Sequence, residues 1–172
     1  MIPKVGYFKK VPYEQFKADY KVPADFPEER IREIYDNIKL PKRSTSGSLC
    51  YDFFAPFYIC LHPNESVVIP TGIRVIPDEG WGLLLYPRSG QGFKFRLQLD
   101  NTVGIIDTDY YGSDNSGHIM AKITNDSREE KTCTIDVGKG FMQGMFTPYG
   151  ITYDDDADGV RNGGFGSTDK AR

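Results

Sequence analysis

The chain has few of the residues that build cross-linked or histidine-rich proteins, with three cysteines and two histidines among 172 residues. An odd, sparse set of cysteines (Cys50, Cys60 and Cys133) cannot form a disulfide framework and is typical of proteins in a reducing compartment. The two histidines, His62 and His118, lie far apart in the sequence. A histidine-rich metal site is therefore not expected, and a serine or cysteine nucleophile would have to depend on one of these two rings.

Long apolar runs and an excess of positive charge are also missing. No stretch approaches the roughly 18 consecutive apolar residues that a membrane span needs. Residues 1–7 contain no apolar run of the kind found in signal peptides. We therefore expect a soluble, cytoplasmic protein without a membrane partner. The 21 basic and 24 acidic side chains give a net charge of −3, which argues against a nucleic-acid partner bound through its phosphates.

The apolar residues before about residue 45 are spaced for helices. Four of them predict one helix with a single apolar face, namely Ile31, Ile34, Tyr35 and Ile38. We expect this helix to begin near a capping box formed by Asp25 and Glu28 and to end before Pro41. Its apolar face must be buried, because an isolated helix of this length is marginal in water. A shorter helix is predicted over residues 13–20.

From about residue 48 onward, short β-branched or aromatic runs alternate with turn residues. The clearest runs are residues 66–76, 80–86, 117–124 and 132–137. Glycine, proline, asparagine and aspartate separate them, as at residues 90–92. Many short strands without an intervening long helix predict an all-β sandwich or barrel. Residues 150–172 are acidic and then rich in glycine, so we expect a tail that contributes little to the core.

Two short segments carry side chains suited to chemistry at a pocket wall. Asp107 and Asp109 follow the apolar run 103–106, and their side chains point to one side if the segment stays extended. A carboxylate there can deprotonate a water molecule, although a strand that ends in a solvated acidic turn has the same pattern. Arg88, beside Ser89 and a glycine, suits phosphate oxygens or, alternatively, a strand end with an exposed arginine.

The segment 161–168 is the third candidate. Its glycines allow backbone N–H groups to converge on an anion, and Ser167 and Thr168 add hydroxyl donors. Phe165 lies among these glycines and has a ring that can stack on a planar base. The alternative is a C-terminus without fixed structure.

In their order, these segments resemble the five motifs of the trimeric dUTPase family over roughly residues 38–170. The third and fifth motifs are the most specific. The resemblance implies a β jelly roll or distorted barrel in three parts: an N-terminal helical extension (1–37), a dUTPase-like β domain (38–150) and a C-terminal phosphate-binding tail (151–172). It also implies a homotrimer whose active sites lie between subunits, with the tail reaching over a neighbour.

The resemblance also assigns roles to individual residues. Asp107 matches the general base, and Asp52 matches the residue that holds waters around Mg²⁺. The residues that the resemblance implies for substrate binding are Arg88, Ser89, Gly90, Asn101, Gly104, Ile106, Tyr110, Gln143, Arg161, Phe165, Gly166, Ser167 and Thr168. Among these, Asn101 with the backbone of Gly104 and Ile106 would read uracil, and Tyr110 would pack under the deoxyribose.

The implied reaction is hydrolysis of dUTP to dUMP and pyrophosphate, by attack of a water on the α-phosphorus with Mg²⁺ on the phosphates. One alternative is a dUTPase fold with a regulatory, protein-binding role. Another is dCTP deaminase, which shares the fold but needs a glutamate where this chain has Asp107. The chain also departs from the family pattern, because Gly140 stands where an arginine is usual and Arg161 is four rather than five residues before Phe165. Residues 113–117 look like an insertion.

Overall fold

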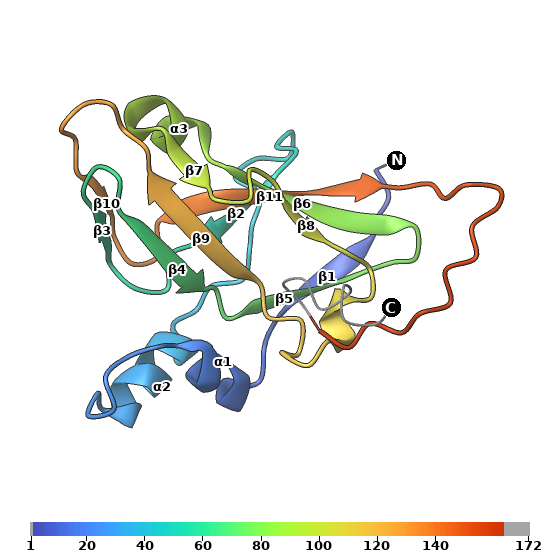
Figure 1. The fold of residues 1–172 in the computed structure, drawn as a ribbon, viewed down its shortest axis with the longest axis horizontal. Helices are drawn as coiled ribbons and strands as arrows, with labels where there is room; N and C mark the ends of the chain where they lie inside the picture. The colour runs from blue at the N-terminus through green and yellow to red at the C-terminus, as the bar shows by residue number, and fades with distance from the viewer. Residues whose placement is uncertain (1, 164–172) are drawn as a thin grey trace.

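The strands form antiparallel sheets, which confirms the predicted all-β architecture. The computed structural model describes residues 2–163 (Figure 1). Its largest sheet has the order β2 (Tyr51–Phe54), β11 (Gly140–Pro148), β6 (Trp81–Pro87) and β8 (Gly104–Ile106). A second sheet has the order β4 (Ser66–Pro70), β9 (Met120–Asn125) and β7 (Leu97–Leu99). Two further pairs join β1 (Gly6–Lys10) to β5 (Ile73–Pro77) and β3 (Ile59–Leu61) to β10 (Cys133–Ile135).

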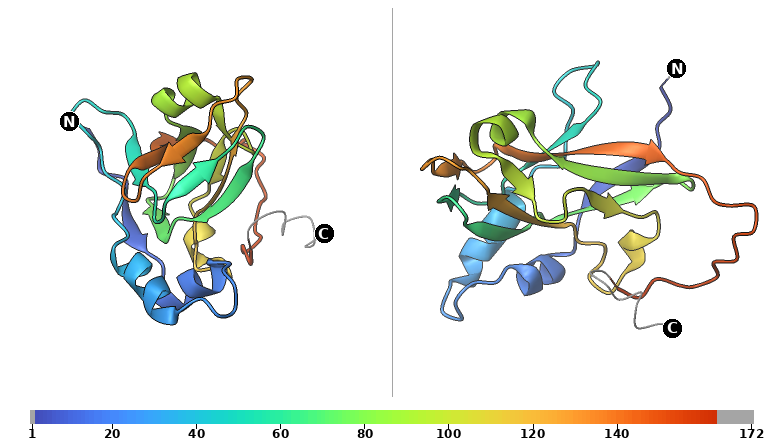
Figure 2. Two further views of the ribbon diagram at one scale, coloured as in Figure 1. Left: turned by 90° about the vertical axis from the view of Figure 1, so that its left-hand side faces the viewer. Right: turned by 45° about the horizontal axis from the view of Figure 1, so that its top comes forward.

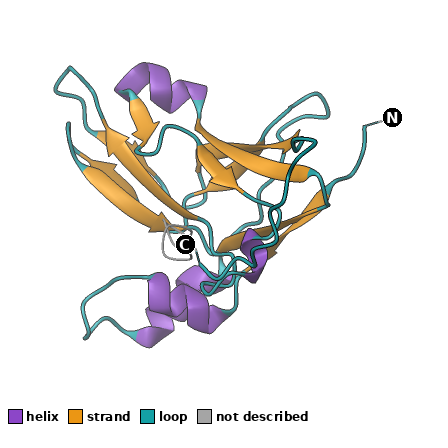
Figure 3. Cartoon of the chain, turned by 45° about the vertical axis from the view of Figure 1, so that its right-hand side comes forward, coloured by secondary structure: helices purple, strands orange, loops and turns teal. Residues whose placement is uncertain are grey.

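The core lies between the two larger sheets, which face each other with two helices below them (Figure 3). Alternate residues of the strands point inward, as in the buried and exposed alternation of β5. The fully buried side chains come from both sheets and from the N-terminal segment, and include Phe16, Phe53, Ile69, Leu83, Ile123 and Phe141. Within the described range, no helix is both long and apolar enough to cross a membrane.

The run 66–76 is two strands rather than one. The chain turns at Thr71 and Gly72, so that β4 pairs with β9 whereas β5 pairs with β1. Gly72 has φ of +71°, and a Cβ there would lie 2.2 Å from Ile38 Cδ1, so only glycine fits. The Thr71 hydroxyl supports the corner by donating to the Ile119 carbonyl over 2.7 Å. The β-branched composition runs through the corner, so it gave no sign of the break.

The glycine-rich residues 90–92, which the sequence predicted to be a turn between strands, lie in a helix. Residues Ser89–Phe95 form a short helix, α3, which ends at Arg96 in the left-handed region with φ of +49°. Gln91 anchors this helix by donating from Nε2 to the Gly140 carbonyl over 3.0 Å. A tertiary contact therefore holds a helix whose own composition disfavours it.

The N-terminal segment contains both predicted helices, α1 (Tyr13–Asp19) and α2 (Glu28–Asp36), and also the strand β1, which was not predicted. The prediction of a capping box formed by Asp25 and Glu28 was wrong. Helix α2 begins after Pro27 without a side-chain cap, because the ring of Pro27 already holds φ at −61°. The helix ends at Asp36, five residues before Pro41, although Ile38 in the following turn is still buried.

The N-terminal helices pack on the β structure, as the apolar stripe predicts. Ile31 and Ile38 are buried, while Ile34 and Tyr35 are half-buried against the core. The Tyr35 hydroxyl also donates to the Val11 carbonyl over 2.7 Å. Figure 2 shows this segment along one side of the sheets, so its burial contributes to the same core.

His118 ties α1 to the body of the protein and is fully buried. Its Nδ1 lies 2.6 Å from Asp19 Oδ2, and its Nε2 accepts a hydrogen bond from the Gly72 N–H over 2.8 Å. Because Nε2 is an acceptor, the ring is neutral with its proton on Nδ1. Burial lowers the pKa of His118 below its usual value of 6.5, and the neighbouring Asp19 carboxylate only partly offsets this effect.

Phe16→Ala should lower the free energy of unfolding by about 3–5 kcal/mol, because it leaves a cavity where a fully buried ring joins α1 to the core. Urea unfolding followed by circular dichroism measures this loss. Glu14→Ala, an exposed position of the same helix, is the matched control and should change stability little. A loss below about 1 kcal/mol for Phe16→Ala would show that α1 is not part of the core.

His118 should make the protein less stable in mild acid. The unfolded chain takes up a proton near pH 6.5, whereas the folded ring resists protonation, so its stabilisation is complete above that pH and is lost as the pH falls toward the folded pKa. The slope from this group cannot exceed about 1.4 kcal/mol per pH unit. Urea unfolding between pH 7.5 and 5 measures it, and His118→Gln should flatten the curve in this range. An identical curve in the variant would contradict the assignment.

Candidate active site

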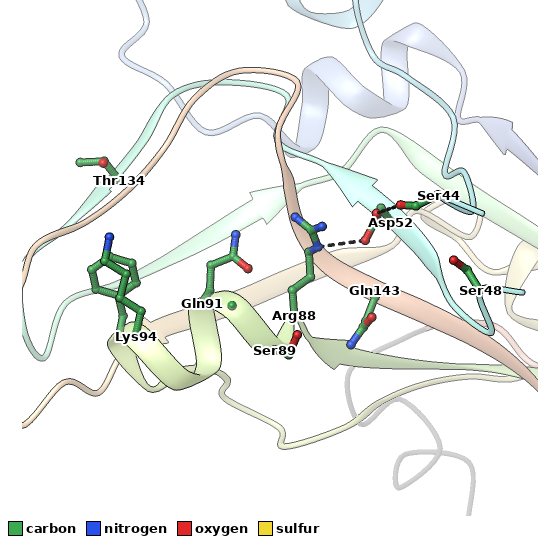
Figure 4. A pocket seen from close by; sticks show the side chains of 11 residues that line it. Ser44, Ser48, Asp52, Arg88, Ser89, Gln91, Lys94, Thr134 and Gln143 are labelled. Atoms are coloured by element: carbon green, nitrogen blue, oxygen red, sulfur yellow. Dashed lines mark hydrogen bonds and ion pairs between the residues drawn. The ribbon is translucent and has the colours of Figure 1, made fainter.

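Two pockets lie at opposite ends of β6. The first, which we call the phosphate pocket, has a volume of about 580 Å³ and opens where β6 leads into α3 (Figure 4). It is lined by polar side chains from five parts of the chain, among them Ser44, Ser48, Asp52, Arg88, Gln91, Lys94 and Gln143. The pocket therefore gathers the residues of the first, second and fourth motifs.

An ion pair forms the centre of the phosphate pocket. Arg88 Nε lies 2.9 Å from Asp52 Oδ1, and the Ser44 hydroxyl donates to Asp52 Oδ2 over 2.9 Å (Figure 4). Both charged side chains remain partly exposed, at 36% for Arg88 and 16% for Asp52. The fixed carboxylate orients the guanidinium, whose remaining N–H groups can bind an anion.

Gly140 provides the space for this arrangement. The Arg88 guanidinium lies over the backbone of Gly140 and donates from Nη1 to its carbonyl over 3.0 Å. A Cβ at Gly140 would lie 2.7 Å from the same Nη1. The Arg88 side chain thus occupies the space above Gly140, where a side chain would collide with it, while its Nε pairs with Asp52.

Strand β11 places Gln143 between Asp52 on β2 and Tyr86 on β6. From there the Gln143 amide donates to the Pro87 carbonyl over 3.0 Å, which supports the backbone just before Arg88. Ser89 and Gly90 form the first turn of α3, and both are exposed at the rim of the pocket. Two further residues of the pocket were not among the predicted site residues. Gln91 donates to the Gly140 carbonyl, and Ser44 donates to Asp52.

The second pocket, which we call the carboxylate pocket, has a volume of about 550 Å³ and lies beside the start of β6. Asp107 and Asp109 reach into it just after β8, although residues 107–109 form a turn and are not extended as the sequence suggested. Arg161 connects the two carboxylates, with Nη2 paired to Asp107 and Nε 2.9 Å from Asp109 Oδ1. The tail segment thus returns to the third motif of its own chain (Figure 1).

Tyr110 follows these carboxylates in the chain and lies beside Arg161. It begins the 3₁₀ turn η1 (Tyr110–Gly112), is buried, and has its ring centroid 5.8 Å from Arg161 Cζ. Burial raises the pKa of the Tyr110 phenol, so its hydroxyl keeps its proton and donates to the His118 carbonyl over 3.0 Å. Asn115 donates in turn to the Tyr110 hydroxyl over 2.9 Å.

The segment 113–117, which looked like an insertion, is a compact turn. The buried Ser113 hydroxyl lies 2.7 Å from both the Tyr110 carbonyl and Asn115 Oδ1. Gly117 has φ of +69°, and a Cβ there would lie 2.4 Å from the Tyr111 Cα, so this position also requires glycine. The turn is thus built into the support of Tyr110.

The remaining predicted residues are more dispersed. Asn101 lies in the exposed loop between β7 and β8 and lines neither pocket, whereas Gly104 and Ile106 are buried on β8. Asp100, which the sequence did not single out, holds this loop by pairing with Lys122 Nζ over 2.7 Å. This pairing lowers the pKa of Asp100. Phe165, Gly166, Ser167 and Thr168 lie outside the described residues.

The two pockets are well separated within one chain. In the register of β6 and β8, Leu83 faces Ile106, so Asp107 lies beside Gly82, while Arg88 follows the far end of β6. Six residues of extended chain separate Gly82 from Arg88, a distance of about 20 Å. The general-base candidate and the phosphate-binding arginine are therefore well apart within one chain.

The sequence of this chain matches one protein family and enzymes that carry that family's name. The sequence model of the dUTPase family matches residues 36–169. The deoxyuridine 5'-triphosphate nucleotidohydrolase of Lactococcus lactis is 40% identical over 134 residues, covering 76% of this chain and 88% of that protein. The enzyme of the same name from Hahella chejuensis is 35% identical over 145 residues, covering 80% of this chain and 91% of that protein.

Solved structures agree with the sequence comparison. The crystal structure of the dUTPase from Streptococcus mutans superposes with a TM-score of 0.59 and 32% identity, covering 77% of this chain and 96% of that one. A mutant dUTPase from phage phi11 of S. aureus, at 24% identity and a TM-score of 0.59, covers 72% of this chain and 92% of that one and shares the fold. The match over most of the chain, the relatives and the fold together show that the chain belongs to the dUTPase family.

Proposed function

We propose that this chain hydrolyses dUTP to dUMP and pyrophosphate, with Asp107 as the general base. The observation that carries this proposal is the position of Asp107, whose half-exposed carboxylate lies in a pocket at the end of a buried strand, next to the buried ring of Tyr110. A carboxylate in this setting can accept a proton from a water molecule aligned with a phosphorus atom. The family membership supplies the substrate.

The chemical step is a displacement at the α-phosphorus. Asp107 takes a proton from water as the water oxygen forms a bond to the α-phosphorus. The bond from that phosphorus to the bridging oxygen breaks, and pyrophosphate leaves with the electron pair. Arg88, held by Asp52, would bind the phosphate oxygens and stabilise the negative charge that builds on the leaving group.

Arg161 covers Asp107 in this structure, so the reaction requires it to move. We propose that Arg161 transfers to the substrate phosphates when these enter, which opens the carboxylate to water. Base recognition would fall to Asn101 with the backbone of Gly104 and Ile106, and Tyr110 would pack under the deoxyribose and leave no space for a 2′-hydroxyl. Ser89, Gly90 and Gln143, together with residues 165–168 of the tail, would complete the contacts to phosphate and base.

The phosphate pocket suits a magnesium ion that arrives on the substrate. Mg²⁺ is usually bound by one or two carboxylates together with phosphates and several waters. Between residues 2 and 163, no three acidic, histidine or cysteine side chains cluster as a protein-only metal site. Asp52 still has lone pairs free to hold a metal-bound water, besides those that bind Arg88 and Ser44. When bound, Mg²⁺ would offset negative charge on the phosphates. The phage phi11 enzyme has a structural Mg(II) ion, but the proposal for this chain depends on Asp52.

The distance between the two pockets supports a site shared between chains. Because Arg88 and Asp107 lie about 20 Å apart along β6, a complete site would take Arg88 from one chain and Asp107 from another. We therefore propose a homotrimer with three shared active sites. A cytoplasmic location belongs to the same proposal, since Cys50, Cys60 and Cys133 are all free thiols.

Purified protein should release pyrophosphate from dUTP, and far more slowly from dCTP or UTP. Asp107→Asn should lower kcat by at least about 100-fold, because the amide keeps the shape but cannot take up a proton. Binding of a non-hydrolysable dUTP analogue should stay within a few-fold. The control is Asp109→Asn, which also loses a contact with Arg161 and should keep kcat within about tenfold of the parent. Comparable losses in the two variants would contradict the assignment of the base.

Mixing two inactive variants tests the shared site. Arg88→Ala and Asp107→Asn should each be inactive alone, but refolding them together in equal amounts should restore activity. With random assembly, about a quarter of the sites receive an intact Arg88 and an intact Asp107 from different chains. Pyrophosphate release from the mixture measures the recovery. If the mixture stays as inactive as its components, both residues belong to one chain's site.

A further inference from the structure

A chain of hydrogen bonds links the N-terminal helix α1 to Tyr110, which follows the two carboxylates of the carboxylate pocket. Asp19, the last residue of α1, pairs with His118 Nδ1, and the His118 carbonyl accepts the hydroxyl of Tyr110. Asn115 joins the two by donating to the Tyr110 hydroxyl over 2.9 Å and to the His118 carbonyl over 3.2 Å. Helix α1 lies before residue 36, where the match to the dUTPase family begins.

Each member of this link has little freedom to move. His118 is fully buried, and both of its ring nitrogens are used, one by Asp19 and the other by the Gly72 N–H. Asp19 is itself oriented by Gln15, whose Nε2 donates to Asp19 Oδ2 over 2.8 Å. Because the ring of His118 cannot turn without losing both bonds, Asp19 and the Gly72 N–H together hold this ring in one orientation.

His118 is also the fixed end of the segment that carries the active-site carboxylates. The segment 107–118 begins at Asp107, passes through Tyr110 and the compact turn at 113–117, and ends at His118. At its start, the Thr108 hydroxyl donates to the Trp81 carbonyl over 2.7 Å. The segment therefore has one anchor on β6 and a second at His118, which is bonded both to Gly72 of the β body and to Asp19 of the N-terminal helix.

We propose that Asp19 is a positioning residue for dUTP hydrolysis, which through His118 holds Tyr110 and Asp107 where the substrate meets them. This inference rests on the proposed function. It gives the N-terminal segment, which precedes the residues matched by the family, a part in catalysis. The phosphate pocket lies at the other end of β6 and has no part in this link, so Asp19 should affect kcat more than KM.

Asp19→Ala removes the acceptor of the buried Nδ1–H, and we expect kcat to fall by about tenfold or more, because small displacements of reacting groups are costly. KM should change less than kcat. Asp19→Asn keeps an acceptor oxygen and should restore kcat to within a few-fold of the parent. Asp25→Ala is the matched control, since Asp25 is an exposed acid of the same N-terminal segment and should leave kcat unchanged.

Hydrogen exchange followed by mass spectrometry provides a readout that does not depend on activity. In Asp19→Ala, the amides of 107–118 should exchange faster, while β2, β6 and β11 keep the protection of the parent. Asp19→Asn and Asp25→Ala should match the parent throughout. If the parent does not hydrolyse dUTP, the proposed function fails, and the exchange pattern still decides whether Asp19 holds the segment.

Three results would overturn the proposal: parental kcat with parental exchange in Asp19→Ala, an equal loss of kcat in Asp19→Asn, or faster exchange spread evenly over the chain. If Asp19→Ala does not fold, Gln15→Ala decides, because Gln15 is half-buried and orients Asp19 from outside the segment 107–118. Faster exchange in 107–118 with reduced kcat supports the proposal in that variant, and parental values of both contradict it.

Discussion

The hydrogen-bond register of β6 determines where every part of the site lies. Strand β6 is paired on one side with β11, which places Gln143 beside Tyr86, and on the other with β8, which places Asp107 beside Gly82. A shift of one residue in either pairing would turn the side chains of that strand to the opposite face. Because the two pockets lie at opposite ends of this seven-residue strand, Arg88 and Asp107 are well apart within one chain, which is the basis for proposing a site shared between chains.

The position of Arg88 in the phosphate pocket depends on the absence of a side chain at Gly140 as well as on the charge of Asp52. Its guanidinium is fixed by the Asp52 carboxylate and by the Gly140 carbonyl, and it occupies the position that a side chain at Gly140 would need. An arginine side chain that is already held in this way loses little further conformational freedom when it binds an anion. Gly140 therefore provides the space in which Arg88 reaches both the Asp52 carboxylate and the Gly140 carbonyl, with further N–H groups left that can bind an anion.

The sequence predicted the all-β architecture, the two N-terminal helices and the order of the motifs, because each depends on local spacing or on a short string of residues. It did not predict the corner at Gly72 or the helix after Arg88, since both result from contacts with residues far along the chain, Ile38 and Gly140. The link from Asp19 to His118 spans 99 residues of sequence and has no local signal. Likewise, nothing near Asp107 indicates that Arg161 covers it.

We propose that Arg88 and Asp107 act on one substrate molecule from different chains. A crystal structure of the protein with Mg²⁺ and a non-hydrolysable dUTP analogue would show whether they do. We expect a trimer in which each analogue contacts Arg88 of one chain and lies beside Asp107 of another, with Arg161 moved from Asp107 to the phosphates. An analogue bound by Arg88 and Asp107 of a single chain, or bound while Arg161 still pairs with Asp107, would contradict it.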